Sequence, residues 1–139
     1  MTHYTETTEG MQIEAFPEYV AEQSCPERGL FFFSYRIRIT NHNGHPAQLV
    51  DRHWIIRDGK GVVREVKGPG VVGQQPVLNP GEAFEYSSFC PLPTATGNMR
   101  GTFTMREETS GREFSTKIPL FFLRDTRHLE MKSVWEAKA

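Results

Sequence analysis

The stretch that decides the fold is LFFFSYRIRIT, residues 30–40, in which large apolar and polar side chains alternate. One set of alternate positions is apolar: Phe33, Tyr35, Ile37 and Ile39. The other set is polar: Ser34, Arg36, Arg38 and Thr40. A period of two is typical of a strand with one buried and one exposed face. The segment is therefore predicted to be a half-buried β-strand.

The next segment along the chain has the same character. Residues 41–44, NHNG, have the composition of a turn, and residues 47–57 again read as extended. Within that second stretch Trp54 and Ile56 fall on one face. The two strands and their turn are predicted to form a β-hairpin.

Short strands recur outward from this pair, at residues 11–20, 62–66, 83–90, 101–106 and 114–123. Pro17 indicates an edge position or a bulge in the first of them, because proline lacks a backbone N–H. Turn residues separate strands at the spacing typical of β-sandwiches. The predicted fold is all-β, an antiparallel β-sandwich of about seven strands of fibronectin type III or immunoglobulin type. The predicted core includes Trp54, Phe84, Tyr86, Phe103, Phe114 and Ile118.

Length and composition leave room for one domain. The chain has 139 residues, a hydrophobic fraction of 37% and a net charge of -1. We expect residues 1–10 to be a flexible N-terminal segment, residues 11–123 to be the sandwich and residues 124–139 to be a C-terminal tail, with a short helix over 129–137 as one alternative for that tail.

The same composition argues against several partners and compartments. Basic residues are scattered, so no nucleic-acid partner is expected, and no apolar run suits a signal peptide or membrane span. The sequence therefore predicts a cytoplasmic protein that does not bind membranes. Cys25 and Cys90 are expected to be free thiols in a reducing compartment.

Several motifs in order carry a family resemblance. They are Arg52-His53-Trp54, the run GVVGQQPV at residues 70–77 and the run GNMRGTFTM at residues 97–105. Together they resemble the ApaG family, once called CorD, over about residues 13–123. Gln74 and Phe89 depart from that pattern, in which Glu and a small residue are common.

The resemblance implies a fibronectin type III-like fold and a small cytoplasmic protein. It also implies an association with diadenosine tetraphosphate metabolism and with cobalt and magnesium resistance. Similar domains occur at the ends of larger eukaryotic proteins, including an F-box protein. This occurrence implies a role in protein recognition.

A glycine-rich loop suggests phosphate chemistry. The candidate phosphate ligands are Arg64, Lys67, Gly68, Gly70 and Gly73, of which the glycines match G-x-G-x-x-G. Pro76 and Pro80 interrupt the following segment, so the helix that this fingerprint needs is not expected. The alternative is a loop whose glycines allow positive φ or close packing.

Histidines suggest two further kinds of site. His42, His45 and His53 are candidate divalent-metal ligands, and the alternative is that they are solvated surface residues. His53 could also serve as a base for Ser87, Ser88 or Cys90, but no nucleophile motif surrounds them. The chain is predicted not to be an enzyme and to need no cofactor.

Clustered aromatic residues suggest an interaction surface. Phenylalanines occupy both faces of residues 31–33 and 121–122, so Phe32, Phe121 and Phe122 are candidates for an exposed patch. The alternative is that loops or the N-terminal segment cover them. The predicted function is a protein-interaction or regulatory module whose partner is another protein. Alternatives are a homodimer through an open strand edge, a weak phosphate or nucleotide ligand, and divalent-metal binding.

Overall fold

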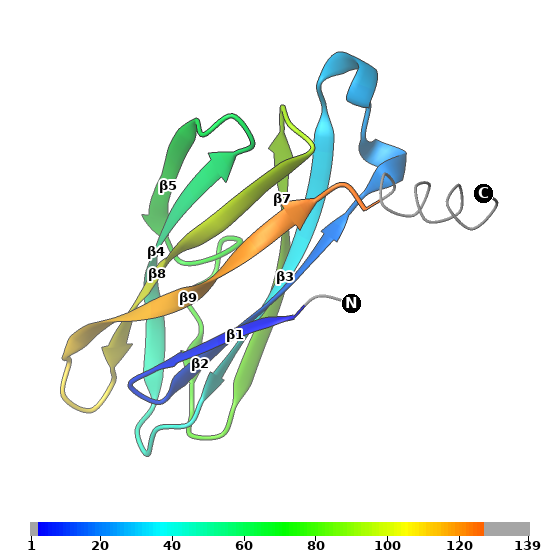
Figure 1. Cartoon of the computed structure of the whole chain (residues 1–139). Coiled ribbons are helices and arrows are strands. Elements are labelled where there is room, and N and C mark those ends of the chain that lie inside the picture. The colour runs from blue at the N-terminus through cyan, green and yellow to red at the C-terminus, as the bar shows by residue number, and fades with distance from the viewer. Residues whose placement is uncertain (1–2, 127–139) are drawn as a thin grey trace.

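The chain folds as two antiparallel β-sheets packed face to face (Figure 1). The computed structural model describes residues 3–126. The first sheet has the order β1-β2-β3-β7, with bounds Tyr4–Thr8, Met11–Tyr19, Phe31–Asn41 and Ala83–Leu92. The second sheet has the order β5-β4-β8-β9, with bounds Val63–Pro69, Ala47–Asp58, Thr96–Glu107 and Glu113–Arg124. The short strand β6, Val77–Leu78, also pairs with β4, and the 3-10 helices η1 (Ala21–Gln23) and η2 (Pro26–Arg28) lie between β2 and β3.

The sandwich predicted from the sequence is confirmed, and the alternating pattern explains it. The odd-numbered side chains of β3 from Phe33 to Ile39 are buried, whereas the polar ones between them are only half-buried. Of the predicted core residues, five are buried: Trp54, Tyr86, Phe103, Phe114 and Ile118. Phe84 is half-buried and packs against the core. The Trp54 ring meets Phe103 and Phe121 edge to face, at centroid distances of 6.2 and 5.9 Å.

The predicted hairpin between residues 30–40 and 47–57 is wrong. β3 pairs with β2 and β7, whereas β4 pairs with β5, β6 and β8 in the other sheet. The fully buried Asn41 explains the crossing, because its side-chain amide donates to the carbonyls of His45 and Leu78 at 2.9 Å each. It also accepts the N–H of Asn43 at 2.8 Å. Residues 42–46 therefore form an arch that crosses from the first sheet to the second, in place of a hairpin turn within one sheet.

The N-terminal residues are more ordered than the sequence suggested. Residues 4–8 form β1 and pair with β2 from Tyr4↔Ala15 to Thr8↔Met11, so they belong to the sandwich. Pro17 lies beyond the described pairing of β1, and among residues 3–126 the one strand that pairs with β2 at Pro17 is β3. Within the described residues Pro17 is therefore at an edge, one of the two positions that the sequence predicted for it. The predicted tail helix over 129–137 falls outside the described residues.

The two long sides of the sandwich differ. On one side β1 lies beside β9, and the N–H of Lys117 donates to Thr8 Oγ1 at 3.1 Å (Figure 1). On the other side β7 and β5 end their sheets, and no described strand pairs with their outer edges. The space between the sheets is therefore closed at β1 and β9 and accessible between β5 and β7.

No helix among residues 3–126 has the length and apolar character required to cross a membrane.

Candidate functional site

A pocket lies between the sheets on their accessible side, with a volume of about 290 Å³. Polar groups enter it from both sheets: Tyr35, Tyr86 and Ser88 from β3 and β7, and Arg52 and Arg64 from β4 and β5. Its apolar walls include Trp54, Val66, Val71 and Met99. The pocket thus combines hydrogen-bond donors with a partly apolar interior, a combination typical of small-molecule sites.

Tyr86 provides the most unusual group in this pocket. Its hydroxyl is the one buried side-chain nitrogen or oxygen among the described residues that has no hydrogen-bond partner. Burial raises the pKa of Tyr86 well above 10.0, and the neighbouring Tyr35 raises it further. The hydroxyl therefore stays protonated at neutral pH and is able to donate. A buried donor without an acceptor is costly, so it calls for an explanation.

Two arginines frame the pocket and brace its walls. Arg52 Nη1 donates to the carbonyls of Pro69 and Gly70, at 3.0 Å each. Arg64 reaches across from β5 to β7, where its Nη2 donates to the carbonyl of Pro91 at 3.3 Å. Each of these contacts uses a single terminal nitrogen, which leaves further N–H groups on each planar guanidinium.

The charges of these arginines act on their neighbours. Burial raises the pKa of Tyr35, while Ser88 and the Arg52 charge partly offset that rise. Burial also raises the pKa of the Cys90 thiol, against the opposing effect of Arg64. No carboxylate of residues 3–126 lines the pocket. The arrangement therefore presents positive charge and donors, and it is suited to receive an anionic or hydrogen-bond-accepting group.

The predicted phosphate loop does not gather its ligands. Arg64 lines the pocket, whereas Lys67 pairs with His53 and lies on the outer face of the second sheet. Gly68 is a residue of β5 itself, and a Cβ there would lie 3.1 Å from Arg52 Nη1. Gly70, with φ +60°, could not accept a Cβ without a clash with the Gln74 carbonyl.

The rest of that loop also lacks the expected context. Gly73 has φ +78° in a turn that bridges Val71 and Gln74, and the chain then enters β6. No helix follows, as the prolines predicted. The glycines of this loop are therefore explained by positive φ angles and close packing, which was the alternative to a phosphate site.

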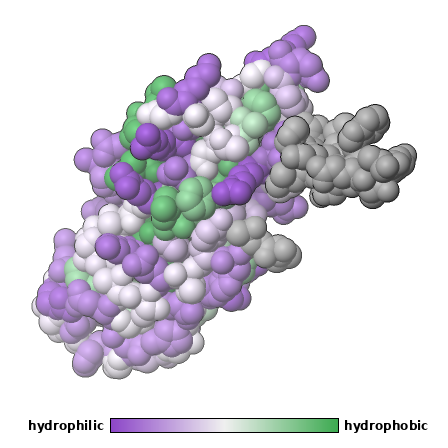
Figure 2. All heavy atoms as spheres, viewed as in Figure 1, coloured by the Kyte–Doolittle hydropathy of each residue, from purple (hydrophilic) through white to green (hydrophobic). Residues whose placement is uncertain are grey.

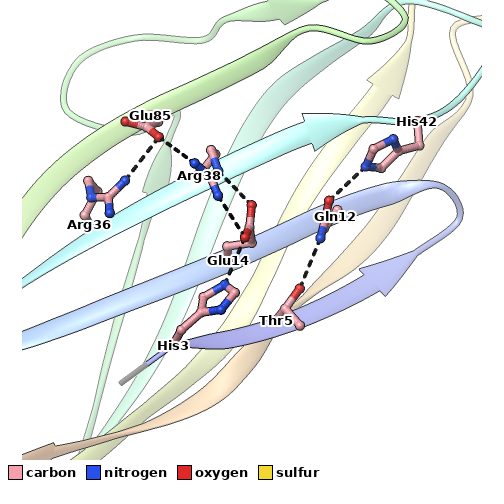
Figure 3. Close-up of polar contacts among 8 residues, drawn as sticks. All are labelled: His3, Thr5, Gln12, Glu14, Arg36, Arg38, His42 and Glu85. Carbon is pink, nitrogen blue, oxygen red and sulfur yellow. Dashed lines mark hydrogen bonds and ion pairs between the residues drawn. The ribbon is translucent and has the colours of Figure 1, made fainter. Parts of the chain in front are cut away.

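The candidate metal ligands are dispersed. His42 Nε2 lies 2.8 Å from Gln12 Oε1 on the outer face of the first sheet (Figure 3). His53 Nε2 lies 2.7 Å from Glu65 Oε1 on the outer face of the second. His45 is exposed near the arch. Within residues 3–126, no three His, Cys, Asp or Glu side chains are grouped so that they could hold a metal ion.

The suggested base and nucleophiles are also apart. His53 faces outward from β4, while Ser88 and Cys90 face the interior from β7 in the other sheet. Ser87 lies on the opposite, exposed face of β7. Because burial raises the pKa of Cys90, its thiolate is disfavoured. This geometry assembles no nucleophile and base from these residues.

The aromatic candidates divide between core and surface. Phe121 is fully buried, so its inclusion in an exposed patch is wrong, whereas the Phe122 side chain is 40% exposed. Phe32 is half-buried on the outer face of the first sheet, 5.3 Å from the exposed ring of Phe89. Leu120 and Val63 are also exposed, and both lie on the outer face of the second sheet with Phe122.

Sequence reasoning missed the pocket and most of this outer face. Tyr86 was predicted to be a core residue and Tyr35 to lie on the apolar face of its strand, and both are buried, but nothing in the sequence indicated that they meet Arg52. The alternation of Leu120 and Phe122 in the last strand was the available signal for the outer face.

The two packed antiparallel sheets define a small β-sandwich protein with a pocket between its sheets. Comparison with known proteins then places it in a family. The family model described as the ApaG domain matches residues 21–107, and the chain belongs to this family.

Individual relatives agree. The chain is 51% identical over 119 residues to Protein ApaG of Bordetella pertussis, covering 86% of this chain and 90% of the relative. It is 47% identical over 126 residues to Protein ApaG of Methylobacterium sp. (strain 4-46), covering 91% and 95% respectively.

Solved structures support the same fold. A crystal structure of the putative ApaA protein from Bordetella pertussis superposes with a TM-score of 0.82 at 51% identity, covering 84% of this chain and 94% of that one. The C-terminal domain of wzt superposes with a TM-score of 0.54 at 10% identity, covering 88% and 77%, and this likeness concerns the fold alone.

Proposed function

We propose that the protein is a non-enzymatic interaction module that binds a partner protein through the outer face of its second sheet. The observation that carries this proposal is a continuous exposed surface on that sheet in which large apolar side chains lie beside arginines. Figure 2 shows apolar side chains gathered over the middle of this face and near its β4–β5 end.

The strand register defines the surface. One row crosses the sheet as Val63↔Arg57↔Asn98, and Asn98 in turn pairs with Phe122. Since neighbouring strands lie about 4.8 Å apart, this row spans on the order of 14 Å. The next row includes Ile55 and Arg100, with Leu120 nearby on β9. These seven residues are named here the β4–β9 surface.

Exposure and charge favour a protein partner with acidic and apolar residues. Val63, Leu120 and Phe122 are 52, 46 and 40% exposed. Arg57 and Arg100 are exposed and form no salt bridge with any carboxylate among residues 3–126. Aromatic residues and arginine are enriched at interfaces, and unpaired arginines would attract carboxylates of a partner.

The first sheet offers a weaker alternative. On its outer face Arg38 forms a two-pronged contact with Glu14, at 2.7 and 3.0 Å, and also reaches Glu85 (Figure 3). Arg36 contacts Glu85 as well, at 3.1 Å. Because these charges already neutralise one another, much of that face has less to gain from a charged partner.

This proposal also gives the family associations a physical route. An effect on diadenosine tetraphosphate metabolism or on cobalt and magnesium resistance would pass through the bound partner, without chemistry in this chain.

Site-specific photocrosslinking in cells tests the proposal. A benzophenone amino acid at position 122 is expected to crosslink a discrete partner, and the same group at Thr5 on the first sheet is the control. The crosslink should disappear when Arg100→Glu is added, because reversal of that charge repels an acidic partner.

Purified components then test affinity. Arg57→Glu and Leu120→Ser should each weaken binding of the identified partner, by about tenfold or more if the residue lies at the centre of the interface. Equal crosslinking from positions 5 and 122, or unchanged affinity of both folded variants, would contradict the proposal.

A further inference from the structure

We infer that the pocket between the sheets binds a small organic carboxylate with an apolar body. This site is separate from the β4–β9 surface, since its polar groups come from the facing inner sides of the two sheets and none of the seven surface residues lines it. A test of ligand binding in the pocket therefore does not depend on the proposed protein partner.

Tyr86 has a buried hydroxyl without a hydrogen-bond partner among the described residues. Tyr86 lines the pocket, and its buried hydroxyl is protonated and has no acceptor in the described part of the chain. A ligand oxygen in the pocket would satisfy this donor, which otherwise remains desolvated and unpaired. Buried polar groups of this kind give a site strong selectivity for the partner that completes them.

The lining of the pocket is positively charged. Arg52 and Arg64 contribute two guanidinium groups to the lining, which contains no acidic residue from the described part of the chain. Arg52 acts electrostatically on both tyrosines, lowering the pKa that burial raises in each. Arg52, Arg64 and Tyr86 thus contribute three donor groups to one pocket, and arginine matches the planar geometry of a carboxylate.

The volume and the apolar walls of the pocket limit what kind of ligand it can hold. A volume of about 290 Å³ falls near the lower end of the range found for ligand pockets, so the ligand is small. Trp54, Val66, Val71 and Met99 give an apolar floor for a hydrocarbon or aromatic body. A free phosphate would leave those walls unfilled and would carry more charge into a partly apolar space.

The exposed rim suggests how a ligand enters. Val72 and Phe89 both line the pocket, and their side chains are 53 and 58% exposed. A carboxylate passing between them would meet Arg64 near the mouth and Tyr86 deeper in. Two sources present this chemistry, a free small acid and the C-terminal carboxylate of a peptide that ends in an apolar residue.

Amide NMR titration of the full chain tests the inference. The probes are 3-phenylpropionate, the neutral 3-phenylpropanol, N-acetylphenylalanine as a model of a peptide terminus, its carboxamide, and inorganic phosphate. 3-Phenylpropionate is expected to give saturable shifts at Val71 and Ser88 at concentrations of about 10 mM or below. Tighter binding of N-acetylphenylalanine than of 3-phenylpropionate, lost in its carboxamide, would assign the source to a peptide terminus, and the reverse order to a free acid.

Variants connect the shifts to the named groups. Tyr86→Phe and Arg64→Gln are each expected to weaken 3-phenylpropionate binding by about tenfold or more, because each loses a hydrogen bond to a charged group. Arg28→Gln, an equivalent change at an exposed arginine of η2, should leave the affinity unchanged. Tyr86→Phe keeps the ring and its packing, so a folding defect does not confound this comparison.

Four results would overturn the inference. One is the absence of saturable shifts with both carboxylates, and another is equal binding of 3-phenylpropanol. A third is wild-type affinity in both Tyr86→Phe and Arg64→Gln. The last is phosphate binding at the same amides more tightly than either carboxylate, which would assign the pocket to inorganic anions.

Discussion

Replacement of Tyr86 by phenylalanine should stabilise the free protein, although loss of a tyrosine hydroxyl usually destabilises a buried site. The change removes one oxygen that is buried without a partner and leaves the ring in place. A buried unsatisfied polar group costs about 1–3 kcal/mol. Because neighbouring groups relax in part, we expect Tyr86→Phe to raise the free energy of unfolding by about 1 kcal/mol.

Urea unfolding of wild type and variant measures this difference. Tyr35→Phe is the matched control, because Tyr35 lines the same pocket and its hydroxyl has Ser88 as a polar neighbour that lowers its pKa. That control should lower the free energy of unfolding by about 0.5–1.5 kcal/mol. The two tyrosine variants are therefore expected to change stability in opposite directions.

Binding of a carboxylate ligand should change the difference in stability between the wild type and Tyr86→Phe. Saturation with 3-phenylpropionate stabilises the wild type more than Tyr86→Phe, because the ligand binds the wild type more tightly. The stability advantage of the variant should then shrink or reverse. If Tyr86→Phe instead destabilises the free protein as much as Tyr35→Phe does, the hydroxyl has a partner in solution and the reasoning about an orphaned donor is refuted.

Three further expectations concern the fold. Asn41→Ala should lower the free energy of unfolding by about 2–4 kcal/mol in urea titrations, since the buried Leu78 carbonyl and the part-buried His45 carbonyl lose their donor; a loss below about 1 kcal/mol would contradict the role of the arch. Gly70→Ala should cost more than Gly81→Ala, because both have positive φ but only Gly70 meets backbone within 4 Å of an added Cβ, and the reverse order in thermal unfolding would refute this. The bond from Arg38 holds the pKa of Glu14 below 4.5, so its stabilisation is present above that pH and is lost as the pH falls through the lowered pKa. Glu14→Gln should therefore flatten the dependence of melting temperature on pH in that acidic range, and an unchanged slope would count against this assignment.

The sequence predicted strands and faces well because both follow from local alternation. β3 and β4 lie close to their predicted bounds, and Trp54 and Ile56 do share the buried face. Pairing between strands depends on contacts far apart in the chain, so the hairpin was not predictable from turn composition. Asn41 has the residue type expected of a turn, but its amide is bonded to Leu78, 37 residues away.

The division between Phe121 and Phe122 has a similarly specific cause. In β9 the buried positions are even-numbered up to Ile118 and odd-numbered from Pro119 onward. The parity changes between Ile118 and Pro119, where the pairing with β8 shifts register between Met99 and Gly101. Strict alternation would have placed Phe122 inside, so the exposed member was not separable from the buried one by pattern alone.

The pocket was beyond sequence reasoning for a further reason. Its polar groups come from four strands, β3, β4, β5 and β7, and no local spacing connects them. Arg52 stood out as part of a family motif, but its position depends on the packing of its guanidinium against Gly68 and on its bond to the Gly70 carbonyl. Only the folded arrangement brings that guanidinium to the two tyrosines.

The contact between β1 and β9 brings the beginning and end of the described domain together. The Tyr4 ring lies 6.2 and 6.4 Å from the rings of Phe121 and Phe122, at the far end of the sequence. Since the two ends meet, a short linker could join them and the backbone could be opened instead at the exposed turn around Lys60, giving a circular permutant. The same geometry lets such a sandwich be spliced into a surface loop of another polypeptide without stretching either junction.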